Sequence, residues 1–138
     1  MNDLKIDKKI SEMIFNIYRM MKKNFDLDKE INLTMIQLHG LVFIEKNENC
    51  QLTDLAKAFS ITLPSANNLV ERLINLRLIE KKQDKNDQRL IRLSVNERGK
   101  NLIKKIAKKQ KKCFSTLINK LSYEEKKKLL EILKKIIS

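Results

Sequence analysis

The chain has 138 residues, a formal net charge of +13, two glycines and one proline. With so few helix breakers, it is expected to form one compact unit or two small ones, built mainly from α-helices. The charge favours a polyanionic partner, nucleic acid before a membrane surface, although a lysine-rich composition can also reflect the nucleotide bias of a genome.

Targeting signals and disulfide bonds are not expected. The N-terminus alternates Asp, Lys and Ile, and the apolar residues come in stripes rather than in one long run. We therefore expect no signal peptide, no membrane span and a cytoplasmic location. Cys50 and Cys113 lie far apart in the sequence, which excludes a disulfide scaffold.

A long amphipathic helix is the first predicted element, and it ends in the polar stretch 24–30. Its apolar residues recur at spacings of three and four, with charged and amide residues between them. They are Ile6, Ile10, Met13, Ile14, Ile17, Met20 and Met21.

Two shorter helices are expected next. Thr34 and Gln37 match a capping box, so a second helix should begin at Thr34 and stop in the polar segment 46–49. Thr53 is the expected cap of a short third helix around Leu55.

The stretch 62–76 predicts a fourth helix. Thr62 can cap its first turn, and Pro64 fits that turn because its missing N–H is not needed there. Six apolar residues at helical spacing form one buried stripe. They are Ala66, Leu69, Val70, Leu73, Ile74 and Leu76. With the short helix before it and a break at residues 60 and 61, this helix completes a helix-turn-helix by length and pattern.

The outer face of this fourth helix carries small hydroxyl and amide side chains. Ser65, Asn67 and Asn68 lie near its start, where they suit hydrogen bonding to base edges, and Arg72 is placed for a phosphate. We hypothesise that Asn67 and Asn68 favour adenine, whose N6 and N7 pair well with an asparagine amide. Site selection that returned G·C-rich sequences beneath this helix would contradict the hypothesis.

After this helix the apolar period changes from about 3.6 to about 2, which predicts a β-hairpin with strands near 78–81 and 91–95. The tip, residues 83–88, is wholly polar. A hairpin directly after a helix-turn-helix is the winged-helix arrangement. Asp87 and Arg89 lie on one side of an extended chain, so the carboxylate can orient the guanidinium. Alternatively, the tip is a solvated turn whose charges discourage edge-to-edge pairing.

From residue 96 the chain is expected to be helical to its end. A long helix carries an apolar stripe opposite a run of lysines, and Ser122 with Glu125 forms a second capping box before a last amphipathic helix. The terminal helices have more apolar surface than a small winged helix can cover, so we expect a second copy to bury it. The lysine run is expected to be a solvated face, with DNA contact as the alternative.

Residues 33–99 resemble the MarR family of bacterial transcription regulators. The resemblance rests on six short motifs in the family's order and spacing. They are Leu33-Thr34-x-x-Gln37, Leu55-Ala56, Pro64-Ser65-Ala66-Asn67-Asn68, Arg72-Leu73, Asp84-x-x-Asp87-x-Arg89 and Asn96-Glu97-x-Gly99. The chain departs from the family at Lys81 and Gln88, where arginines are common. It also departs at Arg77, where a glycine usually ends the recognition helix. Arg77 must adopt a left-handed conformation, at roughly 1 kcal/mol, or the helix must end differently.

The resemblance implies a mainly α winged helix-turn-helix protein with long dimerisation helices at both ends. Residues 1–32 would be the N-terminal dimerisation helix, 33–96 the DNA-binding domain and 97–138 the C-terminal dimerisation helices. It implies a sequence-specific homodimeric repressor on a palindrome of double-stranded DNA. A small aromatic or anionic effector would release the DNA by changing the distance between the two recognition helices.

The site residues that follow from the pattern and the resemblance fall into four groups. The recognition helix offers Ser65, Ala66, Asn67, Asn68 and Arg72. The wing offers Lys81, Lys82, Lys85, Asp87 and Arg89. Contacts to the DNA backbone are expected from Thr53 and Lys57. An effector pocket would be lined by Tyr18, Met21, Met35, His39 and Phe43, although helical spacing also fits core packing for each of them.

Catalytic chemistry is not predicted. His39 is the single histidine, and neither a Cys/His pair nor a glycine-rich phosphate loop is present, so we expect no enzyme, no metal and no cofactor. Redox activity of Cys50 or Cys113 stays open. Two alternatives to a specific regulator remain: a protein-interaction winged-helix module with incidental charge, and a nonspecific chromosome-coating protein with steep salt dependence.

Overall fold

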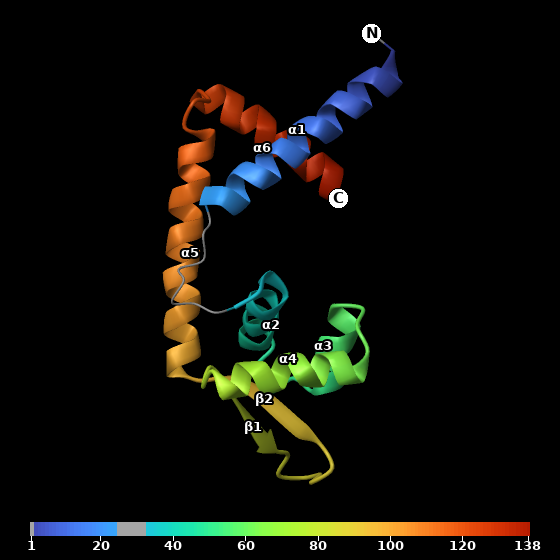
Figure 1. Cartoon of the computed structure of the whole chain (residues 1–138), viewed down its shortest axis with the longest axis vertical. Helices are drawn as coiled ribbons and strands as arrows, with labels where there is room; N and C mark the ends of the chain where they lie inside the picture. Colours follow the sequence, from blue (N-terminus) through green and yellow to red (C-terminus); the bar gives the residue numbers. More distant parts are fainter. Residues whose placement is uncertain (1, 25–32) are drawn as a thin grey trace. The chain divides into compact units, whose positions relative to one another are not determined.

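The structure is a computed structural model that describes residues 2–24 and 33–138. Its elements, in chain order (Figure 1), are α1 (Asp3–Asn24), α2 (Met35–Lys46), α3 (Leu52–Ala58), α4 (Leu63–Asn75), β1 (Ile79–Gln83), β2 (Ile91–Val95), α5 (Glu97–Ile118) and α6 (Tyr123–Ile137). This order confirms the predicted mainly helical winged helix-turn-helix. The elements divide between two compact units. The first holds α1, the end of α5 from Lys108 and α6, and the second holds α2 to α5 as far as Ala107.

The second unit has a continuous apolar core between α2, α3, α4 and the hairpin. Its largest fully buried side chains are Leu38, Leu41, Ile44, Leu55, Val70, Leu73 and Leu93. Gly40 lets α2 approach α4 closely, because a Cβ atom there would lie 2.7 Å from Cδ2 of Leu69. Leu102 and Ile103 of α5 pack against the same core, which is why this unit continues past the hairpin.

The predicted cap of α2 is confirmed and that of α3 is wrong. At α2, the Gln37 N–H donates to Thr34 Oγ1 at 3.3 Å and the Thr34 N–H donates to Gln37 Oε1 at 3.0 Å. At α3, the helix begins at Leu52, one residue before Thr53, and the Asp54 carboxylate accepts from the Gln51 N–H at 2.8 Å. Thr53 therefore lies inside the first turn, because Gln51 is the N-cap and Asp54, three positions on, accepts from the Gln51 backbone N–H, as the acidic residue of a capping box does.

Both ends of α4 are fixed by local hydrogen bonds. At the start, Thr62 Oγ1 accepts from the Ser65 N–H at 3.2 Å, and Pro64 lies in the first turn, as predicted. At the end, Arg77 adopts a left-handed conformation with φ 58°. The Arg77 and Leu78 N–H groups then reach back to the carbonyls of Ile74 and Leu73, at 2.8 and 3.0 Å. These bonds make a Schellman motif, which normally uses glycine.

Arg77→Gly is expected to stabilise the second unit by about 1 kcal/mol, because glycine adopts this left-handed conformation without a Cβ clash. Urea denaturation at fixed protein concentration measures the change. The matched control is Arg98→Gly, which removes the same charge from an exposed position inside α5. That variant should lose stability, by less than about 1 kcal/mol, because glycine is a poor helix former and Arg98 lies in the first turn rather than in the helix interior. Equal signs for the two variants would contradict the prediction.

The hairpin is a two-stranded antiparallel sheet in which Ile79 pairs with Val95 and Lys82 with Arg92 (Figure 1). A third chain segment adds to it, because Leu93 forms an isolated antiparallel bridge with Cys50. The Leu93 N–H donates to the Cys50 carbonyl at 2.8 Å, and the Asn49 N–H donates to the Leu93 carbonyl at 3.1 Å. The connection between α2 and α3 is therefore joined to the base of the wing.

Asn96 links the end of α4 to the start of α5. Its side-chain N–H donates to the Arg77 carbonyl at 2.8 Å, and its backbone N–H donates to the Leu78 carbonyl at 3.1 Å. Its side-chain oxygen accepts from the Gly99 N–H at 2.9 Å. Gly99 makes this contact possible, because a Cβ atom there would lie only 2.3 Å from the Leu78 carbonyl oxygen.

The first unit exposes a large apolar surface. In α1 and α6, side chains that are more than half exposed include Leu4, Ile10, Met13, Ile14, Phe15, Tyr18, Met20, Leu130, Ile132, Ile136 and Ile137. The predicted capping box of α6 is confirmed, with Glu125 N–H to Ser122 Oγ at 3.2 Å and Ser122 N–H to Glu125 Oε2 at 2.7 Å. None of the described helices is both long and apolar enough to cross a membrane.

Candidate nucleic-acid interface

The outward face of α4 presents three of the predicted readout side chains. Ser65, Asn67 and Asn68 are exposed in the first two turns of the helix. Ala66 has no exposed surface and belongs to the core, so its predicted contact with bases is wrong. The reason is helical periodicity: Ala66 shares the inward stripe with Leu69 and Val70, which are also buried. The remaining three side chains offer hydroxyl and amide groups to a ligand beside the helix.

An ion pair joins α4 to the wing. The Lys81 ammonium on β1 donates to Glu71 Oε1 on α4, and both side chains are partly exposed. Lys81 was predicted to contact a DNA phosphate, whereas here it is paired with a carboxylate that neutralises it. Arg72, the neighbour of Glu71, is partly buried and has interactions of its own.

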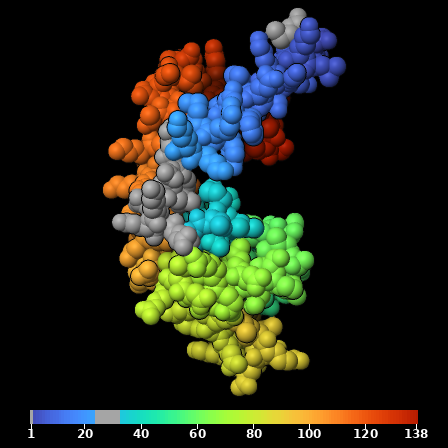
Figure 2. All heavy atoms as spheres, in the orientation of Figure 1, coloured from blue at the N-terminus to red at the C-terminus, as the bar shows by residue number. Residues whose placement is uncertain are grey.

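The wing tip is shaped by two carboxylates. Asp84 Oδ1 accepts from the N–H groups of Asn86 and Asp87 at 2.8 and 3.2 Å. Asp87 Oδ1 accepts from the Arg89 N–H at 3.0 Å and from Arg89 Nε at 3.2 Å. The predicted contact between Asp87 and Arg89 is therefore present, and the Arg89 side chain remains 90% exposed. Figure 2 shows the hairpin projecting from the second unit.

Arg92 also belongs to this site, although it is not among the residues predicted from the sequence. Its Nε donates to Asp84 Oδ2 at 3.0 Å, and its Nη1 donates to the Asn49 carbonyl at 3.4 Å. The Asn86 N–H, and then the Arg92 guanidinium, hold the pKa of the Asp84 carboxyl below its usual value. The stabilisation that this carboxylate provides is thus present above the ordinary carboxyl range and is lost only as pH falls through the lowered pKa. The sequence did carry a signal for the role of Asp84, because an aspartate at the start of a polar turn commonly accepts from backbone N–H groups two residues on.

The other residues that were predicted to contact the DNA backbone lie on the surface of the second unit. Thr53 and Lys57 are exposed on α3, and Lys82 and Lys85 are exposed on the hairpin. With Arg89, they give the unit several positive groups near the outward face of α4 and on the wing. This distribution suits a ligand with repeated negative charges.

The predicted effector-pocket residues divide between the two units. Tyr18 and Met21 lie on α1, while Met35, His39 and Phe43 lie on α2. Phe43 packs edge to face against Phe59, with ring centroids 5.7 Å apart, so it has a core role. Met35 and His39 are exposed. The effector pocket stays a prediction.

The two cysteines lie in different surroundings. Cys50 is buried, and this burial, followed by the nearby Asp54 carboxylate, raises the pKa of its thiol. A raised pKa leaves little reactive thiolate at neutral pH. Cys113 on α5 is half-buried. Among residues 2–24 and 33–138, no three His, Cys, Asp or Glu side chains gather as a metal site.

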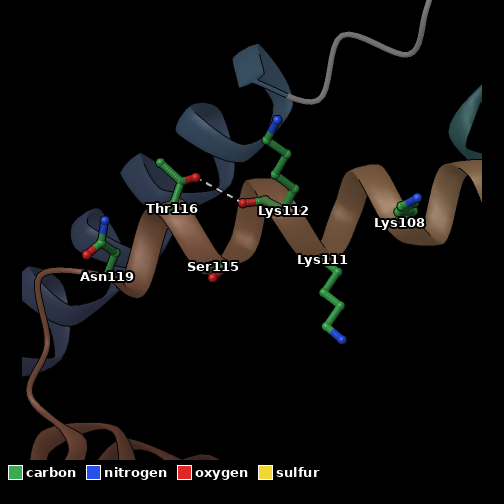
Figure 3. A pocket seen from close by; sticks show the side chains of 6 residues that line it. All are labelled: Lys108, Lys111, Lys112, Ser115, Thr116 and Asn119. Atoms are coloured by element: carbon green, nitrogen blue, oxygen red, sulfur yellow. Dashed lines mark hydrogen bonds between the residues drawn. The ribbon is translucent and has the colours of Figure 1, made fainter.

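A shallow, open hollow in the first unit lies along the lysine-bearing end of α5. Its lining residues are Lys108, Lys111, Lys112, Ser115, Thr116 and Asn119 (Figure 3). Thr116 Oγ1 donates to the Lys112 carbonyl at 3.0 Å, and the Lys111 and Lys112 side chains point away from each other. The ammonium groups therefore do not converge on one point, which is typical of a solvated face.

Comparison with known proteins places this arrangement in a family. The MarR family profile matches residues 33–91. The HTH-type transcriptional regulator BilQ of Clostridioides difficile is 31% identical over 124 residues, covering 84% of each chain. The transcriptional repressor MprA of Escherichia coli K12 is 24% identical over 128 residues, covering 93% of this chain and 70% of that one. Streptococcus pneumoniae FabT, solved in complex with DNA, superposes with a TM-score of 0.79 at 16% identity, over 99% of this chain and 95% of that chain. The chain therefore belongs to the MarR family of transcriptional regulators.

Proposed function

We propose that the chain is a homodimeric repressor that binds a palindromic operator. Each copy would insert α4 into the major groove and its wing into the adjacent minor groove. The observation that carries this proposal is the pairing of an outward polar α4 face with an Arg89 side chain that is 90% exposed and oriented by Asp87. Such a preset guanidinium suits a narrow minor groove, whose potential attracts arginine.

The polar side chains of this surface divide between reading bases and holding phosphates. Ser65, Asn67 and Asn68 would contact base edges, with the two asparagines favouring adenine. Phosphate contacts would come from basic groups on α3, α4 and the wing. They are Lys57, Arg72, Lys82, Lys85 and, after separation from Glu71, Lys81. Thr53, exposed on the first turn of α3, would donate its hydroxyl to the backbone.

A second copy would cover the apolar faces of α1 and α6. These faces are too large to leave in water, and a two-fold axis would also present two recognition helices to a palindrome. A small aromatic or anionic effector would act by favouring a different separation of the two recognition helices. Such a population shift needs only a few kcal/mol.

The test is binding of the purified protein to the DNA upstream of its own gene, titrated against unrelated competitor at fixed, near-physiological salt. Tight binding that survives excess competitor, with two protomers per site, is expected. Arg89→Ala should weaken that binding and leave the fold intact. Binding that is lost when competitor DNA is added would contradict specific autoregulation and favour a nonspecific chromosome-coating protein. Absence of DNA binding would favour the protein-interaction module.

Glu71→Gln is expected to tighten DNA binding and to steepen its salt dependence. The substitution removes a negative charge beside the DNA and frees Lys81 for a phosphate, which makes the slope of log Kobs against log salt more negative by about 0.9. Fluorescence anisotropy at several salt concentrations measures the slope. The control is Glu80→Gln, which removes the same charge from the opposite face of β1 and should leave the slope nearly unchanged. A slope shared by both variants would contradict the role given to Lys81.

A further inference from the structure

The outer half of the hairpin does not pack against the apolar core of the second unit: Leu90 at the tip is partly buried but is not among the residues that contact that core. In β1 only Ile79 is buried, and in β2 the buried residues are Leu93 in the middle and Val95 at the base. Ile91, next to the tip, is 44% exposed. A two-stranded hairpin is only marginally ordered without packing, so polar contacts must fix the direction of the tip.

Arg92 makes polar contacts that can fix the direction of the wing tip. Its Nε donates to Asp84 Oδ2 at 3.0 Å, and the two side chains are only 30% and 19% exposed. Partial burial shields this pair from the screening that weakens surface ion pairs. On its other side, Arg92 Nη1 donates to the Asn49 carbonyl at 3.4 Å. One guanidinium thus spans the wing tip and the connection between α2 and α3.

Both attachment points are themselves held in place. Asn49 has a left-handed backbone with φ 64°, and its N–H donates to the Leu93 carbonyl. At the tip, Asp84 Oδ1 accepts from the Asp87 N–H, and Asp87 in turn holds the Arg89 guanidinium. A continuous series of hydrogen bonds therefore runs from the body of the second unit to Arg89.

We propose that Arg92 and Asp84 form a clamp that ties the wing tip to the α2–α3 connection and thereby sets the direction of Arg89. Arg92 is a positioning residue in this scheme, since it acts on DNA through Arg89. The inference rests on the proposed function, in which Arg89 enters the minor groove. Lysine cannot replace Arg92, because one ammonium lacks the planar fork that meets both acceptors.

A double-mutant cycle tests the clamp. Arg92→Met should lower operator affinity about tenfold when Arg89 is present, but less than about twofold in an Arg89→Ala background. Arg92→Lys should not restore the affinity. Asp84→Asn should behave like Arg92→Met, since its amide oxygen can still accept the backbone N–H groups while its nitrogen cannot accept from Arg92. The control is Lys46→Met, which removes an exposed charge from α2 and should cost equally little in both backgrounds.

A measurement without DNA separates this inference from the proposed function. NMR order parameters for residues 84–90 should fall from roughly 0.85 to below about 0.6 in Arg92→Met, with α4 unchanged. If the unmodified protein binds no operator, the proposed function fails and the order parameters alone decide the clamp. Unchanged order parameters, or equal losses of affinity with and without Arg89, would overturn the clamp.

Discussion

Gly99→Ala is expected to lower the free energy of unfolding by about 3 kcal/mol, because the new methyl group overpacks a rigid contact. Its Cβ atom would lie 2.3 Å from the Leu78 carbonyl oxygen and 2.5 Å from Val95 Cγ1. The first of these atoms is backbone, held in the turn that follows α4. Relief requires α5 to move away from that turn, which would strain the hydrogen bonds of Asn96 to Arg77 and Leu78.

Urea denaturation followed by circular dichroism measures this loss, at one protein concentration for all variants. Gly40→Ala is the matched control, since it also adds one methyl group inside a helix. Its Cβ atom would meet Leu69 Cδ2 at 2.7 Å, the end of a side chain that can turn aside. Better helix propensity, about 1 kcal/mol, should offset much of that contact. Equal stability losses at the two glycines would contradict the backbone argument.

Ile132→Lys is expected to dissociate the proposed dimer. Ile132 lies near the middle of α6 and is 57% exposed, so a lysine there is tolerated by the isolated chain. In a dimer the same ammonium would be buried without a partner, at about 3 kcal/mol or more. Because both protomers carry the substitution, that cost counts twice and corresponds to an increase of about 10,000-fold in the dimer dissociation constant.

Sedimentation equilibrium measures the change, and operator binding should weaken with it, because two linked half-site contacts become independent. Glu131→Lys is the control: it places the same side chain on the neighbouring polar position of α6. That variant should remain dimeric. An Ile132→Lys protein that stays dimeric at micromolar concentration would show that this part of α6 lies outside the interface.

Much of the fold could be predicted because the residues that begin and end its helices interact with near neighbours in the sequence. The caps at Thr34, Thr62 and Ser122 each join residues three apart, so their partners are visible in the sequence. The shift from helical to alternating spacing after α4 likewise marked the hairpin. The prediction for Thr53 was wrong because Gln51 and Thr53 can both open α3, and the pattern alone did not show that Asp54 would accept from the Gln51 N–H.

The interface was less predictable because its orientation depends on contacts between distant segments. Asn49 and Arg92 are 43 positions apart, and Glu71 and Lys81 are on different elements. Neither pair follows from spacing. Ala66 shows a different difficulty: it belongs both to a motif of DNA-reading residues and to the apolar stripe, and only the packed core decides between the two roles.

The junction at Asn96 has a mechanical consequence. The side-chain and backbone N–H groups of Asn96 donate to the Arg77 and Leu78 carbonyls after α4, and its side-chain oxygen accepts from the Gly99 N–H in the first turn of α5. Neither helix end can therefore rotate without the other. Because Gly99 has no side chain, the first turn of α5 can lie directly against the Leu78 carbonyl. A rotation of the first turn of α5 would therefore also move the C-terminal end of the helix that would read the bases, because Asn96 is hydrogen-bonded to both.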